Sequence, residues 1–222
     1  MLNHDEIRKH GERSSKEWIQ YVKENSFTPE ELAELFCNGL YWSGLLLDSE
    51  NLFDVVETFI DCGMDPNQLV YDDWGKEESD TEESEDKFYL TSLIAVTRFE
   101  DGPACAASLK MLLERGGDPN VMHFIKKPGE DGIDYSDNVT DFYYWDVFSH
   151  GPDLDERDFY GLLLCFTYGG TYHSGTAPFE MLIEAPPSVF KDYERYWFEW
   201  NDHEALYVIE KETGKRVAKW VF

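Results

Sequence analysis

The chain has 222 residues, of which 42% are hydrophobic and 16% aromatic, and its formal net charge is −27. This apolar content is sufficient for a folded core and excludes wholesale disorder. The charge excludes any role that depends on contact with phosphate backbones. It favours a basic protein partner, unless it reflects only the general acidity of the host's proteins.

Several features favour a cytoplasmic protein without a membrane segment. No stretch approaches the roughly 18 apolar residues that a membrane span needs, and Met1–Trp18 lacks the apolar region of a secretion signal. The four cysteines have no C-x-x-C spacing, and three of them fall within apolar helical patterns, where a reduced cysteine is a core residue. These four residues are Cys37, Cys62, Cys105 and Cys165.

Residues 1–27 are predicted to form an N-terminal capping helix with apolar positions that include Trp18 and Val22. The next segment, Thr28-Pro29-Glu30-Glu31, combines a capping threonine with a glutamate three residues later. This combination is typical of a helix start and predicts a helix over approximately Leu32–Leu47.

Three apolar segments then follow, and each ends in a glycine 53 residues after the one before: Gly63, Gly116 and Gly169. Before each glycine, four apolar residues recur with spacings of three, three and one, which places them on one helical face. Glycine directly after a helix adopts the left-handed conformation that closes its end. The three faces are Phe53, Val56, Phe59 and Ile60; Ala106, Leu109, Leu112 and Leu113; and Phe159, Leu162, Cys165 and Phe166.

The first two glycines belong to the pattern Gly-x-Asp-Pro-Asn, and the third lacks the Asp-Pro-Asn. Because aspartate, asparagine and proline favour tight turns, we interpret these residues as structural rather than catalytic. The predicted turn residues are Gly63, Asp65, Pro66, Asn67, Gly116, Asp118, Pro119, Asn120 and Gly169.

Each of these helices is preceded by another candidate helix, near Leu32–Leu47, Tyr89–Phe99 and Phe142–Ser149. This layout, with L-x-x-L-L-x-x-G-x-D-P-N over Leu109–Asn120, resembles the ankyrin repeat. The ordinary ankyrin period is about 33 residues, so each unit here contains about 20 extra residues. Thr91–Ala95 also departs from the usual T-P-L-H-x-A, since Ile94 replaces its histidine.

The resemblance implies a mainly α fold: a divergent ankyrin-like array of about three helix-pair units with a C-terminal β-hairpin. A helical solenoid of another type is the alternative. The expected division is residues 1–27 as the capping helix, 28–184 as the repeats (approximately 28–70, 89–125 and 141–184), with inserts at 71–88 and 126–140, and 185–222 as an aromatic segment and hairpin that close the stack.

In ankyrin-like stacking, inserts after the turns form fingers that commonly contact partners. The first insert has nine acidic residues and two lysines between Asp72 and Lys87, so it is either a solvated loop or a clamp for a basic partner. The second begins with a candidate strand, Val121–Ile125. The residues predicted to contact a partner are Asp72, Asp73, Trp74, Glu77, Glu78, His123, Phe124, Tyr135 and Tyr172.

The sequence predicts no catalytic residue, metal site or cofactor. It contains no G-x-S-x-G, phosphate-binding loop, H-E-x-x-H or EF-hand spacing, and its six histidines never pair at three or four residues' distance. We therefore expect a non-catalytic protein–protein interaction module with a basic partner. The alternatives are an immunity or antitoxin-type inhibitor of a cationic toxin such as a nuclease, and an enzyme with its site near the third unit, around His150 or His173.

Overall fold

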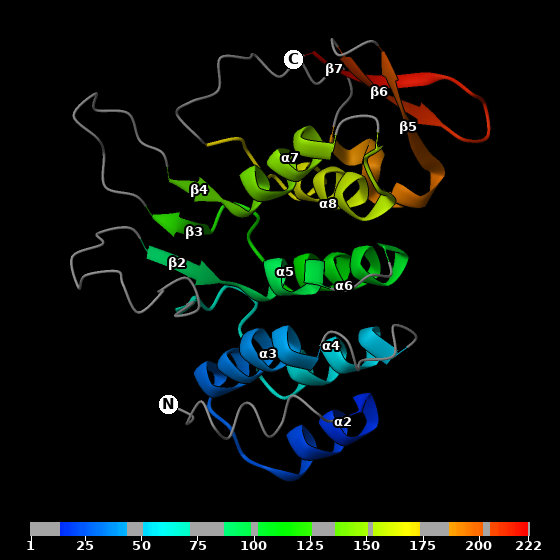
Figure 1. Ribbon diagram of the computed structural model, residues 1–222. Coiled ribbons are helices and arrows are strands. Elements are labelled where there is room, and N and C mark those ends of the chain that lie inside the picture. Colours follow the sequence, from blue (N-terminus) through cyan, green and yellow to red (C-terminus); the bar gives the residue numbers. More distant parts are fainter. Residues whose placement is uncertain are drawn as a thin grey trace, which may run out of the picture.

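The computed structural model describes residues 14–43, 51–71, 87–98, 102–125, 136–150, 153–173, 187–201 and 205–221. Helices are stacked in successive layers along the molecule, and short strands project from one side of the stack (Figure 1). The helical elements are α2 (Ser15–Glu24), α3 (Pro29–Ser43), α4 (Leu52–Asp61), α5 (Ser92–Ala95), η3 (Val96–Arg98), α6 (Gly102–Glu114), α7 (Val139–His150), α8 (Glu156–Thr167) and η5 (Pro187–Arg195).

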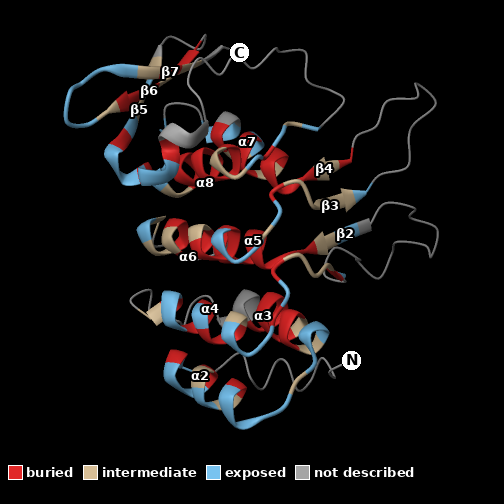
Figure 2. Cartoon of the chain, turned by 180° about the vertical axis from the view of Figure 1, so that it is seen from behind, coloured by how far each residue is buried: buried red, intermediate tan, exposed pale blue. Residues whose placement is uncertain are grey.

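The second helix of each layer packs on the second helix of the next. Helix α4 contacts α2 and α6, and α8 contacts α6, α7 and η5. The facing surfaces of these helices are buried (Figure 2). The stack therefore has one continuous apolar core rather than separate cores in each layer.

Local signals fix where the helices begin. The backbone nitrogen of Thr28 donates to the Glu31 carboxylate at 3.0 Å, and the Glu31 nitrogen donates back to Thr28 Oγ1 at 3.2 Å. This reciprocal pair confirms the capping box that the sequence predicts before α3. Asp155 caps α8 in a similar way, accepting a bond from the Asp158 nitrogen at 3.0 Å.

The predicted apolar faces of α6 and α8 are buried throughout. In α4, however, Phe53 is 41% exposed, so its predicted place in the core is wrong. The reason is that Leu52, Val55, Val56 and Phe59 form the buried stripe of α4, with spacings that suit one helical face. Phe53 lies beside this stripe and faces outward.

The predicted fold class is wrong: the protein is mixed α/β, with 57% helix and 18% strand in two antiparallel sheets of four and three strands. The error has two sources. Strands that adjoin the two inserts pair with each other, so they form one sheet instead of separate fingers. The aromatic run Tyr196–Asn201 is itself a strand, so the C-terminal sheet has three strands instead of a hairpin.

The four-stranded sheet has the order β1-β2-β3-β4, with every neighbouring pair antiparallel. Its central pairing joins Lys87 to Ile125 and Phe88 to Phe124. Because these residues come from different units, the sheet connects one layer of the stack to the next. The strands are β1 (Val70–Tyr71), β2 (Lys87–Leu90), β3 (Met122–Ile125) and β4 (Asp137–Asn138).

The C-terminal sheet covers the end of the stack and contains β5 (Tyr196–Asn201), β6 (Ala205–Glu210) and β7 (Arg216–Val221). Tyr193 and Tyr196 are buried, and the Phe198 ring lies 5.0 Å from that of Phe159 in α8. These rings therefore close that end of the helical core. Trp197 is an exception among them, since it is 49% exposed.

Candidate functional site

The turns that precede the projecting strands are held by repeated contacts. Gly63, Gly116 and Gly169 have φ values of 103°, 99° and 89°, the left-handed backbone expected at these helix ends. Within the first two turns, the side chains of Asp65 and Asp118 accept bonds from the backbone nitrogens two residues later, at 2.9 and 2.8 Å. Such local bonds stabilise a tight turn, so each strand leaves the stack in a defined direction.

Asparagines also join each turn to the next. Asn67 Nδ2 donates to the Gly116 carbonyl at 2.9 Å, and Asn67 Oδ1 accepts from the Asp118 nitrogen at 2.7 Å. Asn120 makes the same pair of contacts with Gly169 and Thr171, at 3.1 and 2.8 Å. The strands are thus anchored on a rigid row of turns along one edge of the stack.

One face of the four-stranded sheet carries two stacked phenylalanines. The rings of Phe88 and Phe124 are 4.3 Å apart and inclined by only 21°. Phe88 is 52% exposed, the largest exposure among the large apolar side chains of the described residues. A pair of rings that pack on each other while one remains open to solvent provides a preformed apolar contact surface.

The neighbouring positions along these strands carry further exposed apolar side chains. The Tyr71 and Tyr89 rings are 6.0 Å apart in an edge-to-face arrangement, and both Tyr71 and Ile125 are exposed. Because successive side chains in a strand point to opposite faces, Tyr89 lies on the face opposite Phe88. The described sheet therefore presents aromatic rings on both faces.

A second group of rings lies between β3 and α7. The His123 ring meets Phe142 edge to face at 5.7 Å, and the Tyr172 ring lies 4.5 Å from Tyr144. Burial lowers the pKa of His123 to about 4, so its ring is neutral at physiological pH. Trp145 of α7 is exposed beside these rings.

The structure places three of the predicted partner-binding residues, His123, Phe124 and Tyr172, in these aromatic contacts. It does not bring them into one cluster, because His123 and Phe124 point to opposite faces of β3. The other predicted contacts lie outside the described residues: Asp72, Asp73, Trp74, Glu77, Glu78 and Tyr135. The sequence analysis missed Tyr71, Phe88 and Tyr89, although Lys87-Phe88-Tyr89-Leu90 is a short β-prone run that could have indicated a strand.

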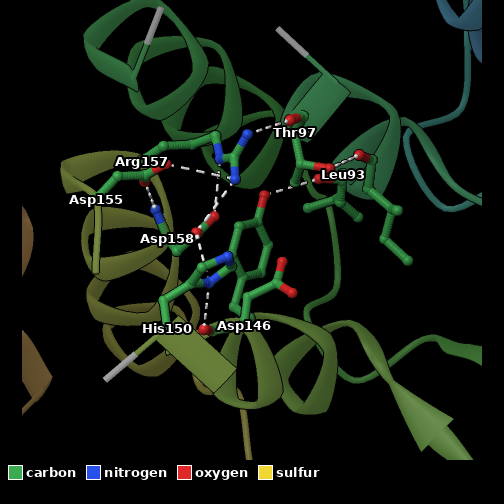
Figure 3. A network of polar contacts seen from close by, with 9 residues as sticks. Leu93, Thr97, Asp146, His150, Asp155, Arg157 and Asp158 are labelled. Atoms are coloured by element: carbon green, nitrogen blue, oxygen red, sulfur yellow. Dashed lines mark hydrogen bonds and ion pairs between the residues drawn. The ribbon is translucent and has the colours of Figure 1, made fainter. Parts of the chain in front are cut away.

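A polar network joins α7, α8 and η3 at the place where the enzyme alternative would put a site (Figure 3). Arg157 donates to both oxygens of the fully buried Asp158, at 2.8 and 3.1 Å, and to the Thr97 carbonyl at 3.1 Å. The bonds from Arg157 to Asp158 raise the pKa of the guanidinium. The ion pair holds the Arg157 side chain within α8, and the bond from Arg157 to the Thr97 carbonyl ties the third layer of helices to the second.

His150 and Asp146 lie at the edge of the same network. His150 Nδ1 is 2.8 Å from the Asp146 carbonyl oxygen and 3.7 Å from Asp158 Oδ2. Burial and the nearby Asp158 carboxylate raise the pKa of Asp146 to about 6. Within the described part of the chain, neither residue has a hydroxyl or thiol group in hydrogen-bonding contact.

The other candidate histidine is held differently. His173 lies at the end of the third turn, where its backbone nitrogen donates to Asp141 Oδ1 at 2.7 Å.

A groove of about 580 Å³ lies elsewhere, along α4, α6 and η5, and neither His150 nor His173 lines it. Its walls combine Phe53 and Met111 with residues of both charges, including Lys110 and Glu114.

The described residues contain no group of three or more histidine, cysteine, aspartate or glutamate side chains placed to hold a metal ion. None of the described helices is long and apolar enough to cross a membrane. Comparison of the chain with protein-family models, curated proteins and solved structures gives no match.

Proposed function

We propose that the protein is a non-catalytic recognition module that binds a basic protein partner through the projecting four-stranded sheet. The observation that carries this proposal is the stacked pair Phe88–Phe124, which is built from two different units and is exposed on one side. Exposed aromatic rings on a rigid support are the side chains that contribute most to protein interfaces.

Charge supports a basic partner at this surface. Strands β1 and β2 directly precede and follow residues 72–86 in the chain. This segment has nine acidic residues and one lysine. Any ligand that reaches Tyr71 or Phe88 therefore approaches the root of a strongly negative segment. Such a field accelerates the association of a cationic protein and disfavours acidic ones.

The resemblance to the ankyrin repeat remains a proposal, supported by the three glycine helix stops and the asparagine bridges between turns. The non-catalytic assignment is supported by the network around Asp158, whose bonds hold helices together. If the partner captured by the protein proves to be a cationic nuclease that loses activity on binding, the module is an inhibitor of the immunity type.

The proposal is tested by capture of partners from the native host, followed by titration of the purified partner. Three baits are compared: the native protein, Phe88→Ser/Phe124→Ser, and the control Phe53→Ser, which changes an exposed phenylalanine on α4, away from the sheet. We expect one basic protein to bind native protein and control alike, more weakly as salt rises. The double variant should bind roughly 30-fold more weakly, as loss of about 2 kcal/mol predicts.

Two outcomes would contradict the proposal. One is a partner whose affinity does not change in the sheet variant. The other is binding of the same strength at low and high salt, since electrostatic recognition requires a decrease.

A further inference from the structure

The turn between β6 and β7, together with strand β7, carries a net charge opposite to that of the rest of the chain. Between Lys211 and Lys219, four basic residues stand against the single acidic residue Glu212. The whole chain has 46 acidic and 19 basic residues, so this stretch reverses the general charge. Residues 211–216, which form the turn between β6 and β7 and the start of β7, are all exposed and project from the end of the molecule (Figure 2).

Basic and aromatic side chains meet on the outer face of this sheet. The Arg216 guanidinium lies 4.0 Å from the centre of the Tyr207 ring, and the Lys219 ammonium lies 5.7 Å from it. Glu199 is the direct partner of Tyr207 in the antiparallel register, so the two side chains lie on the same face of the sheet. Trp197 precedes Glu199 by two residues in the same strand and therefore belongs to this face as well. We call this surface, made of Trp197, Tyr207, Arg216 and Lys219, the basic face.

The exposure of Trp197 separates it from the other rings of its segment. Tyr193, Tyr196 and Phe198 pack inward and close the helical core. Trp197 does not take part in this packing, and half of its surface is open. A tryptophan left open on the same face as two cations combines the apolar and charged groups that dominate interface energetics.

Among the described residues, one acidic side chain lies on the basic face. Glu199 accepts a bond from Arg216 at 3.3 Å, and both side chains are about half exposed. An exposed pair of this kind contributes little stability, so an incoming carboxylate can compete with Glu199 for the guanidinium. Lys219 and the turn residue Lys215 make no ion pair with the other described residues.

We propose that the basic face is a second interaction surface, which binds an acidic segment of another protein. Carboxylates of this segment contact Arg216, Lys219 and the nearby Lys215, while an apolar side chain packs on Trp197. The complementary charge of the occupant follows from Arg216, Lys219 and Lys215. A nucleic acid is disfavoured, because its dense phosphates would be repelled by the remaining acidic surface.

The test uses a fluorescent peptide in which glutamate alternates with leucine, so that an extended strand carries its acids on one face. Anisotropy titrations at low salt compare the native protein with Lys215→Glu/Arg216→Glu and with Lys16→Glu/Lys23→Glu. The latter changes the net charge by the same amount on the exposed surface of α2. Trp197→Ala is a further variant, which leaves all charges unchanged.

We expect the native protein and the α2 variant to bind the peptide with affinities within about twofold of each other. The hairpin charge reversal and Trp197→Ala should each weaken binding roughly tenfold. The same variants should keep the native affinity for the basic partner of the four-stranded sheet, so failure of this inference is distinguishable from failure of the proposed function.

Three results would overturn the inference. The first is that the native protein does not bind the peptide. The second is that the α2 and hairpin variants weaken binding equally, which would mean that only net charge matters. The third is that duplex DNA, titrated in parallel, binds the basic face in preference to the peptide. Circular dichroism and thermal unfolding of each variant show whether a loss of binding comes from loss of the fold, and Trp197→Ala decides the question if the charge reversal unfolds.

Discussion

Asn67 donates a hydrogen bond to the carbonyl of Gly116 at 2.9 Å, and 53 residues later Asn120 makes the same bond to Gly169 at 3.1 Å. Each asparagine also accepts a bond from a backbone nitrogen of the following turn. The repeated spacing in the sequence thus corresponds to a repeated physical contact. These contacts hold adjacent layers in register where the projecting strands begin.

Asn120→Ala should lower the free energy of unfolding by about 1–2 kcal/mol, because three bonds to the third turn are lost while water replaces part of them. Urea denaturation followed by circular dichroism measures this. The matched control is Asn25→Ala, which removes a single bond at 2.8 Å to the Tyr21 carbonyl within one helix end. An equal decrease in the free energy of unfolding in the two variants would mean that the bridge between turns stabilises the fold no more than one hydrogen bond at a helix end does.

The glycines divide into two classes that substitution by alanine should separate. At Gly116 an added Cβ meets no atom within 4 Å, so the cost is only that of the positive φ, roughly 1–2 kcal/mol. At Gly161 it would lie 2.2 Å from the buried Tyr143 ring, whose hydroxyl donates to the Leu93 carbonyl. Gly161→Ala should therefore destabilise the protein more than Gly116→Ala does. Gly116→Asn should destabilise it less than Gly116→Ala does. Thermal unfolding of the three variants gives the order, and a better-tolerated Gly161→Ala contradicts it.

Local features of the fold could be predicted from the sequence, and pairing between distant segments could not. The glycine stops and the Thr28 capping box depend on residues a few positions apart, so their signals are contained in short stretches. Phe88 and Phe124 meet because β2 pairs with β3 across a whole helix pair. No local pattern specifies that register, so the sequence alone predicts separate fingers and a mainly α fold, which is wrong.

The third turn shows a similar limit. It lacks the Asp-Pro-Asn, yet Thr171 takes the place of Asp118 in the bridge. Both residues contribute a backbone nitrogen, which nearly any residue supplies, so the contact persists when the side chain changes. The candidate surface is equally hidden, since the local acidity predicts contacts at residues 72–78 and not at the rings of Tyr71 and Phe88.

The ionisation of Asp146 should make the free energy of unfolding decrease as pH rises. Its pKa of about 6 in the folded state exceeds the ordinary value of 3.8, so the folded state binds a proton more tightly than the unfolded state. The native protein therefore loses stability between about pH 4 and pH 6. Asp146→Asn should be more stable than native protein at pH 7 and no more stable below pH 4. Denaturation at several pH values tests this, with the exposed Asp153→Asn as the control.

His123 should have the opposite effect on the pH dependence of stability. Its folded-state pKa of about 4 lies below the ordinary value of 6.5, so the unfolded state binds the proton more readily. Stability is lost as pH falls from about 6.5 to 4. His123→Phe should remove this loss, and its stability relative to native protein should rise as pH decreases over that range. A constant difference between the two proteins across these pH values would contradict a buried neutral histidine.

The strands that carry the binding surface can be located by hydrogen exchange of the backbone amides in the presence and absence of the captured basic partner. If the four-stranded sheet is the contact, protection on binding should appear in β2 and β3, around Phe88 and Phe124, and should disappear in Phe88→Ser/Phe124→Ser. Protection confined to α2 and α4, with no change in β2 or β3, would contradict recognition through the sheet.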